Sequence, residues 1–211
     1  MEQSVQPAAG KILVFTAPSG AGKTTLVRHL LARLPERLAF SVSATTRAPR
    51  GHEVDGRDYY FLDEAEFRRR VAAGDFLEHE EVYAGQQYGT LRSEVDRIWA
   101  GGRAVVFDVD VNGAHAIKRA YPAATRAVFV APPSEEVLFA RLRGRGTESE
   151  ESVRKRIARA RAELNHRDRF DLVLVNDDLR EAQLAAERIA AEWLAAPNPD
   201  SVTPDTPPPR P

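Results

Sequence analysis

The sequence predicts an α/β fold in which helices flank a mostly parallel β-sheet. Short apolar runs rich in Val, Ile and Phe alternate with longer helical patterns, and this order is typical of parallel sheets. A glycine-containing loop joins the first apolar run to the first helix, and 43% of the 211 residues are hydrophobic, which is enough for one substantial core. We therefore expect one domain with insertions over residues 10–195, preceded by a flexible segment over 1–9.

Several apolar runs have the length and composition of buried strands, and the segments between them have helical periodicity. The expected strands are Lys11 to Ala17, Arg103 to Val109, Thr125 to Ala131 and Asp171 to Asn176. The expected helices are Lys23 to Leu34, Asn112 to Tyr121, Ser134 to Leu142, Ser149 to Leu164 and Leu179 to Leu194. Pro132 and Pro133 stop the third strand, and Ser134 followed by Glu136 marks the start of the next helix.

Two segments depart from this alternation. From about Phe40 to Asp96 the sequence carries scattered Tyr, Gly and Arg, the alternating pieces SVSATTR and DYYFL, and one amphipathic helical pattern at Glu64 to Ala73. We expect an inserted, partly antiparallel α/β subdomain there. The final stretch, Ala196 to Pro211, holds half of the 14 prolines and can neither continue a helix nor bury apolar surface, so it is expected as a disordered tail.

The composition excludes several classes of protein. The 30 basic and 31 acidic residues give a formal charge of −1, without the positive excess of a nucleic-acid binder. No cysteine is present, which excludes disulfides, thiol catalysis and cysteine-bound zinc. The N-terminus MEQSVQPAAG lacks a basic start and an apolar run, and no stretch approaches the roughly 20 apolar residues of a membrane helix. We expect a cytoplasmic protein with neither nucleic-acid nor membrane partners.

The loop after the first strand has the chemistry of a phosphate cradle. Small residues let backbone N–H groups at a helix N-terminus point at phosphate oxygens, and the helix dipole adds favourable potential. In this P-loop arrangement, Lys23 is expected to reach the β- and γ-phosphates and the Thr24 hydroxyl to reach Mg²⁺. The residues expected to bind ATP are Ala17, Pro18, Ser19, Gly20, Ala21, Gly22, Lys23, Thr24 and Thr25. The pattern usually begins with glycine, so a positive φ at Ala17 would be strained. A glycine-rich turn without a ligand is the alternative.

Further motifs follow in order: SVSATTRAPRGHEVDGRDYYF, FLEHEEVYAGQQYGT, VVFDVDVNGA, RLRGRGTESEESVRKR and VNDDL. Together with APSGAGKTTL, this set closely resembles the guanylate kinase family from about Lys11 to Trp193. The resemblance implies a P-loop core, a GMP-binding insertion at about 40–96 and a small helical lid at about 134–164. It also implies Mg²⁺-dependent transfer of a phosphoryl group from ATP to GMP or dGMP.

The resemblance places the acceptor phosphate on Arg47 and Arg50, assisted by Tyr59 and Tyr88. A guanidinium offers paired donors that match phosphate oxygens, which agrees with this role. An ordinary solvated pair of arginines is the alternative. The family usually reads PRxGE, whereas here Gly51 comes one place early, which puts the turn geometry at this point in doubt.

The base pocket implied by the resemblance consists of Ser43, Glu78 and Thr90. Guanine presents N1–H and its 2-amino group side by side, so one carboxylate can accept both, while hydroxyls can donate to O6. Adenine lacks the 2-amino group and has an acceptor at N1, so it would leave Glu78 poorly paired. A solvated acid within the acidic run 78–81 is the alternative for Glu78.

The motif VVFDVD places two acids at the end of a buried strand, where ligands of parallel sheets gather. By the resemblance, Asp108 orients Mg²⁺ and Asp110 faces the guanine side. For Asp110, a helix cap is the alternative. Among the arginines of 141–161, the resemblance assigns Arg141, Arg145 and Arg156 to the phosphates; a nucleic-acid patch or a solvated helix face is the other interpretation. Asn176 is placed near adenine or in a turn.

Two other functions fit parts of the sequence. Guanylate-kinase-like domains also serve as peptide-binding modules, but such a module has no need of Lys23, Thr24 or the lid arginines. A P-loop kinase for another nucleotide would not need the guanine pocket. The expected catalytic set is Lys23, Arg47, Arg141, Arg145 and Arg156. The sequence does not choose between a monomer and a homodimer.

Overall fold

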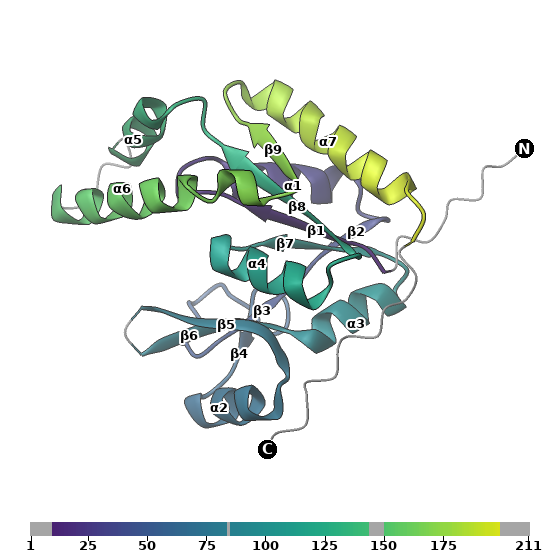
Figure 1. The fold of residues 1–211 in the computed structure, drawn as a ribbon. Coiled ribbons are helices and arrows are strands. Elements are labelled where there is room, and N and C mark those ends of the chain that lie inside the picture. Colours follow the sequence, from purple (N-terminus) through teal and green to yellow (C-terminus); the bar gives the residue numbers. More distant parts are fainter. Residues whose placement is uncertain (1–9, 84, 144–149, 199–211) are drawn as a thin grey trace, which may run out of the picture.

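The computed structural model describes residues 10–83, 85–143 and 150–198. The larger of two sheets contains, in spatial order, β2 (Leu38–Phe40), β7 (Ala104–Asp108), β1 (Ile12–Thr16), β8 (Thr125–Ala131) and β9 (Leu172–Val175) (Figure 1). All neighbouring strands in it are parallel. Phe15 of β1 lies opposite Asp108 and Val128, so the carboxyl ends of the three central strands meet at one edge. Ligands of open parallel sheets bind at that edge.

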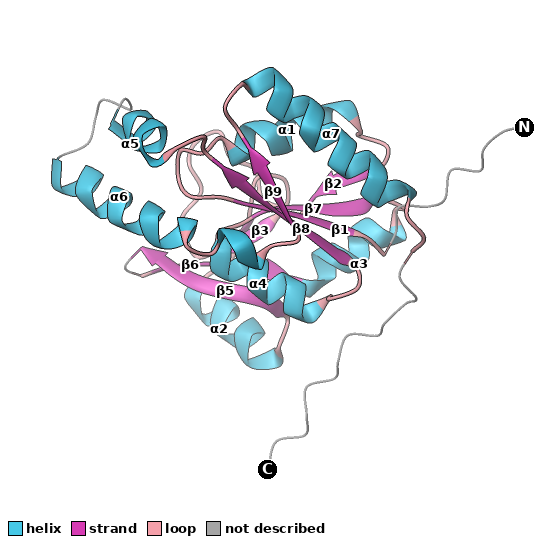
Figure 2. Ribbon diagram, turned by 45° about the horizontal axis from the view of Figure 1, so that its top comes forward, coloured by secondary structure: helices cyan, strands magenta, loops and turns pink. Residues whose placement is uncertain are grey.

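Helices cover both faces of this sheet (Figure 2). They are α1 (Lys23–Arg33), α3 (Arg92–Ala100), α4 (Val111–Ala120), α5 (Glu135–Arg143), α6 (Glu150–Leu164) and α7 (Leu179–Ala195), with the short η1 (Arg167–Arg169) before β9. Leu13 and Phe15 of β1 pack with α1 and α7, whereas Ile12 and Val14 pack with α3 and α4. The strand is therefore buried on both faces, which explains its unbroken apolar run. Among the described residues, no helix has the length and apolar character needed to cross a membrane.

The smaller sheet is mixed and lies beside the carboxyl edge of the larger one (Figure 1). Its spatial order is β4 (Tyr60–Phe61), β3 (Ser43–Thr45), β6 (Gln86–Leu91) and β5 (Phe76–Tyr83). Strands β3 and β4 are parallel, and the other pairs are antiparallel. Helix α2 (Glu64–Ala73) covers this sheet through Phe67, whose ring centroid lies 4.5 Å from that of Phe76. Asp63 caps the helix by accepting from the Glu66 N–H.

The predicted α/β fold is confirmed, and the predicted strands and helices occur within about a residue of their expected ends. Strands β5 and β6, in the expected antiparallel part, and the short η1 had no predicted bounds. Two further elements, β2 and α3, were not predicted at all. Both belong to the larger sheet or its helical layer, although they lie at the two ends of the segment expected as an insertion. The mixed sheet itself runs only from Ser43 to Leu91. The expected flexible segment at 1–9, and the tail from 199 on, lie outside the described residues.

The first strand and the last helix are joined by a buried lysine. Lys11 is fully buried, and its ammonium donates to the carbonyls of Leu194, at 3.0 Å, and Ala196. Arg37 also donates to Leu194 O, at 3.0 Å, and Trp193 Nε1 donates to Ile12 O at 3.1 Å. The last turn of α7 contains no basic residue of its own, so cations from elsewhere satisfy the negative end of its dipole. Burial, and then the charge of Arg37, lower the pKa of Lys11.

Candidate active site

The predicted phosphate loop, residues 17–22, runs from the end of β1 to the start of α1. Gly20 and Gly22 have φ values of +90° and +93°, a region that disfavours side chains. Ala17 has no such conformation, because no described residue other than glycine has a positive φ. The strain considered for Ala17 is therefore absent, and its methyl group packs in the core.

Asn176 supports this loop from the end of β9. It is buried, and its Nδ2 donates to the Ala21 carbonyl at 2.7 Å. A Cβ added to Gly22 would overlap Asn176 Nδ2, so the glycine and the amide are fitted to each other. Arg141 of α5 donates to the Asn176 carbonyl at 3.2 Å. Asn176 thus contacts the backbone of the loop and brings one predicted lid arginine beside it.

Lys23 and Thr24, the first residues of α1, both contact Asp108, the last residue of β7. Lys23 Nζ lies 2.6 Å from Asp108 Oδ1 and donates to the Val109 carbonyl at 2.6 Å. The Thr24 hydroxyl donates to Asp108 Oδ2 at 2.7 Å. Both residues of α1 therefore contact the acid at the end of β7, which lies opposite Phe15 of β1. Within the described residues, no three His, Cys, Asp or Glu side chains gather as a metal site.

Helix α6 reaches the loop through Arg156, whose Nη2 donates to Ser19 Oγ at 3.0 Å. The structure thus places Arg141 and Arg156 beside the phosphate loop. Arg145 lies outside the described residues.

Arg47 is held in a paired contact with Glu53 at the edge of the mixed sheet. Its Nη1 and Nη2 donate to the two Glu53 oxygens, each at 2.9 Å, and its guanidinium lies 5.3 Å from the Tyr59 ring. Glu53 also accepts from the Arg50 N–H at 2.7 Å. These hydrogen bonds, chiefly that from Arg47, lower the pKa of Glu53 to about 2. Glu53 was not predicted as a site residue, yet it orients Arg47 and accepts from the backbone of Arg50, two predicted phosphate ligands.

The turn that contains the early glycine is closed by the Glu53 N–H, which donates to the Arg50 carbonyl at 2.9 Å. Gly51 has no positive φ, and a Cβ there would meet nothing within 4 Å. The turn therefore does not depend on where this glycine stands. On the other side of Arg47, the rings of Tyr59 and Tyr88 lie 6.1 Å apart and edge-on.

Three neighbouring strands bring the predicted base-pocket residues together. Thr90 of β6 lies opposite Ser43 of β3 on one side and opposite Glu78 of β5 on the other. Side chains at directly opposite positions share a face of the sheet. The buried Thr90 hydroxyl donates to Glu78 Oε1 at 2.6 Å. Burial raises the pKa of Glu78, and the nearby charge of Asp110 adds to this rise, while the contact with Thr90 opposes it.

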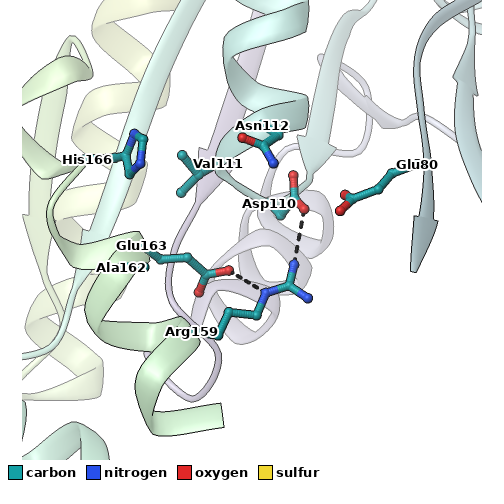
Figure 3. Close-up of a pocket in the computed structure, with 8 residues that line it drawn as sticks. All are labelled: Glu80, Asp110, Val111, Asn112, Arg159, Ala162, Glu163 and His166. Carbon is teal, nitrogen blue, oxygen red and sulfur yellow. Dashed lines mark hydrogen bonds and ion pairs between the residues drawn. The ribbon is translucent and has the colours of Figure 1, made fainter. Parts of the chain in front are cut away.

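Asp110 lies opposite Glu80 and forms one wall of a cavity (Figure 3). Its Oδ1 accepts from the Gly113 N–H at 2.9 Å and caps α4, so the helix-cap interpretation describes a real contact. Its Oδ2 lies 3.3 Å from Arg159 Nη2 on α6. Glu80 points toward Asp110. A hydrogen bond between the two side chains raises the pKa of Glu80 to about 7, and burial of Glu80 is the second cause of this rise.

A cavity of about 280 Å³ opens at this wall, lined by Glu80, Asp110, Arg159 and Glu163 among others. Arg159 also donates to Glu163 Oε1 at 3.0 Å. Neither Glu80 nor Arg159 was predicted as a site residue. Glu80 could have been found, because it follows Glu78 by two positions on one strand and so shares its face. The partner of Arg159 lies 49 residues away and had no signal in the sequence.

Comparisons with known proteins agree with this geometry. A sequence profile described as guanylate kinase matches residues 9–192. The guanylate kinase of Porphyromonas gingivalis is 47% identical over 185 residues, which cover 88% of this chain and 98% of that protein. That of Salinibacter ruber is 53% identical over 81% of this chain and 90% of its own. The crystal structure of guanylate kinase from Anaplasma phagocytophilum is 31% identical, with a TM-score of 0.65 over 90% of this chain and 89% of that one. The chain belongs to the guanylate kinase family.

Proposed function

We propose that this enzyme transfers the terminal phosphoryl group of ATP to GMP or dGMP, in purine nucleotide metabolism and GMP recycling. The observation that carries the proposal is the row of Ser43, Thr90 and Glu78 on three adjacent strands, in a chain whose loop after β1 leads to Lys23 beside Asp108. Such a row offers hydroxyls and one carboxylate to a base whose edge presents one acceptor beside two donors. We place its work in the cytoplasm, with these nucleotides and neither nucleic acid nor membranes as partners.

The residues around Asp108 fit Mg²⁺. The Thr24 hydroxyl and the Asp108 carboxylate, 2.7 Å apart, are the oxygen donors that this ion prefers. When bound with ATP, Mg²⁺ would neutralise charge on the phosphates. Asp108 already holds both Lys23 and Thr24, so it orients the two groups that we assign to the phosphates and the ion.

The transfer needs alignment and charge neutralisation more than proton removal. A phosphomonoester has a second pKa of about 6, so the acceptor oxygen of GMP is already anionic near neutral pH. Arg47 and Arg50 orient the acceptor phosphate, and Lys23 and the lid arginines stabilise the charge that spreads during transfer. Arg141 and Arg156 act from α5 and α6, while Arg145 is assigned this role from the sequence motif alone. Closure over the site also excludes water, which limits hydrolysis of ATP.

Selection of guanine rests on hydrogen bonding in a partly buried pocket. Glu78 accepts N1–H and the 2-amino group, Ser43 and Thr90 supply hydroxyls, and Asp110 faces the same edge of the base. Thr90 donates to Glu78 and so orients its carboxylate. Adenine would leave that carboxylate facing an acceptor, and such mispairing of a site built for hydrogen bonds gives strong discrimination.

The test is a coupled assay of nucleoside diphosphate formation with ATP and Mg²⁺ and each of GMP, dGMP, AMP, UMP and CMP. We expect turnover with GMP and dGMP only. Lys23→Met should stay folded and lower turnover by orders of magnitude, because it removes a positive charge from the transferring phosphates. Equal use of AMP would refute the proposed guanine site, and unchanged turnover of Lys23→Met would refute the phosphate-loop assignment.

A further inference from the structure

Within the described residues, the chain passes between the two sheets twice. It leaves the larger sheet after β2 and enters the mixed sheet at β3, through Ser41 and Val42. It returns from β6 directly into α3. The Ser41 N–H still donates to Val106 of the larger sheet, at 3.2 Å, whereas Ser43 already pairs with Thr90 of the mixed sheet. The Val42 N–H therefore lies at the point where the chain changes sheets.

Glu94, in the first turn of α3, accepts a hydrogen bond from the Val42 N–H. Glu94 Oε2 accepts from this N–H at 2.9 Å, and Oε1 accepts from the Tyr60 hydroxyl of β4 at 2.7 Å. Arg97 donates to the two oxygens at 2.7 and 3.0 Å. Only 2% of the Glu94 side chain is exposed. One buried carboxylate thus joins the first crossing, the edge strand of the mixed sheet and the helix that makes the second crossing.

Hydrogen bonds stabilise the negative charge of Glu94 in its buried position. Burial alone would raise the pKa of Glu94, but the hydrogen bonds from Arg97, Val42 and Tyr60 outweigh burial and leave it below the ordinary value. The N-terminal turn of a helix also favours a negative charge. Glu94 is therefore ionised at neutral pH and accepts from four donors at once. A buried carboxylate is costly when such partners are lost.

Two residues that donate to Glu94 are sequence neighbours of residues assigned to GMP. Val42 precedes Ser43, which we assign to the base, and Tyr60 follows Tyr59, which we assign to the phosphate. We propose that Glu94 is a positioning residue of the GMP site, which holds Ser43 and Tyr59 at the separation that the nucleotide requires. This inference rests on the proposed function and adds a residue that does not touch the substrate.

Substitution of Glu94 by glutamine tests the inference. Glutamine has nearly the same size, but it offers one carbonyl oxygen to four donors and turns an N–H₂ group toward at least one of them. We expect the KM for GMP to rise at least about tenfold, since hydrogen bonds to a charged group are lost. The KM for ATP should stay within about twofold, because the phosphate loop does not contact Glu94. Tyr60→Phe, which removes only the link to β4, should give a smaller rise in the same constant.

Asp171→Asn is the matched control for loss of stability. Asp171 also accepts from a backbone N–H, that of Ala127 at 2.8 Å, and pairs with a cation, Lys118 at 2.8 Å. It directly precedes β9, and its partner Lys118 lies in the last turn of α4, the opposite end of that helix from Asp110. We expect this variant to lower the Tm while leaving the KM for both nucleotides unchanged. A role for Glu94 in stability alone predicts the same behaviour for Glu94→Gln.

The outcomes separate the inference from the proposed function. If Glu94→Gln lowers the Tm as Asp171→Asn does but leaves the KM for GMP unchanged, Glu94 is not a positioning residue, although the enzyme still uses GMP. If Glu94→Gln does not fold, Tyr60→Phe decides, and an unchanged KM for GMP in that variant overturns the inference. If the wild-type protein does not phosphorylate GMP, the proposed function fails, whatever Glu94 does.

Discussion

Replacing Glu78 with glutamine should weaken GMP use without weakening the fold. The substitution keeps the size of the side chain and its place opposite Thr90, but it converts one acceptor into a donor that would face a donor of guanine. In the protein itself, the same change removes a buried negative charge near Asp110. Activity and stability are therefore expected to move in opposite directions.

The pocket determines the size of the effect on GMP use and the sign of the effect on stability. A charge-assisted hydrogen bond in a buried site contributes roughly 1.5–3 kcal/mol, which corresponds to a loss of about tenfold to a hundredfold in kcat/KM for GMP. Stability changes with the opposite sign because burial raises the pKa of Glu78. The folded state then keeps the proton after the unfolded chain has lost it, so wild-type stability falls as pH rises through this interval. Glu78→Gln lacks this loss and should have a Tm at pH 8 at least equal to that of the wild type.

The decisive measurement is the ratio of kcat/KM for GMP to that for AMP, at fixed ATP and Mg²⁺, in both proteins. IMP, which lacks the 2-amino group, reports on one of the two assigned hydrogen bonds. Glu81→Gln is the control, because Glu81 is an exposed acid on the same strand. The KM for ATP should stay within about twofold. If Glu78→Gln keeps the wild-type preference for GMP over AMP, guanine is recognised elsewhere and the base-pocket assignment is wrong.

Three further substitutions test other contacts. Gly22→Ala places a methyl group against Asn176 Nδ2 on a residue whose φ is +93°. We expect a loss of about 1–2 kcal/mol or more in the free energy of unfolding, seen as a lower Tm, and a higher KM for ATP. An unchanged Tm would contradict the described loop. Lys11→Met removes the donor to the Ala196 carbonyl and one of the two donors to the Leu194 carbonyl, so urea unfolding should show a loss of about 1–3 kcal/mol with kcat and KM unchanged; an equal unfolding midpoint would argue against this cap. Glu80, whose pKa is raised to about 7 beside Asp110, keeps its proton in the folded state at pH values where the unfolded chain has lost it, so wild-type stability should fall between about pH 4.5 and 7. Glu80→Gln should reduce this fall in stability by no more than about 1 kcal/mol at a site partly open to solvent, and an unchanged slope in thermal melts would show that Glu80 is not the group that titrates.

The parts of the fold that the sequence predicted well are those with a strong local pattern. Strand β8 (Thr125–Ala131) and helix α2 (Glu64–Ala73) have the predicted bounds, since prolines or a capping acid mark their ends. Helix α3 was missed because it follows β6 without a side-chain cap and because Glu94 occupies its buried face. Strand β2 has only three residues, too few for a period to be read.

The same distinction holds for the site. The phosphate loop and the row of base-pocket residues lie in motifs whose spacing is visible along the chain. Arg159 acts through Asp110, 49 residues away, and the pairing of Glu53 with Arg47 depends on the turn between them, so neither role could be read from spacing. Glu80 is the exception, because it follows Glu78 by two positions on one strand. The resemblance to a family named the groups assigned to the substrates, whereas the groups that orient them had to come from the structure.

The lysine that joins the first strand to the last helix has a consequence for synthesis. Strand β1 lies in the middle of the larger sheet, yet the acceptors for the Lys11 ammonium come 183 and 185 residues later. On the ribosome, the segment with the phosphate loop emerges early, but a nascent chain without α7 would have to bury an unpaired ammonium to complete β1. Since contacts so distant in sequence also form slowly, the central strand should take its final place only when the last helix has been made. An unfinished chain would then not offer a complete nucleotide site in competition with finished enzymes.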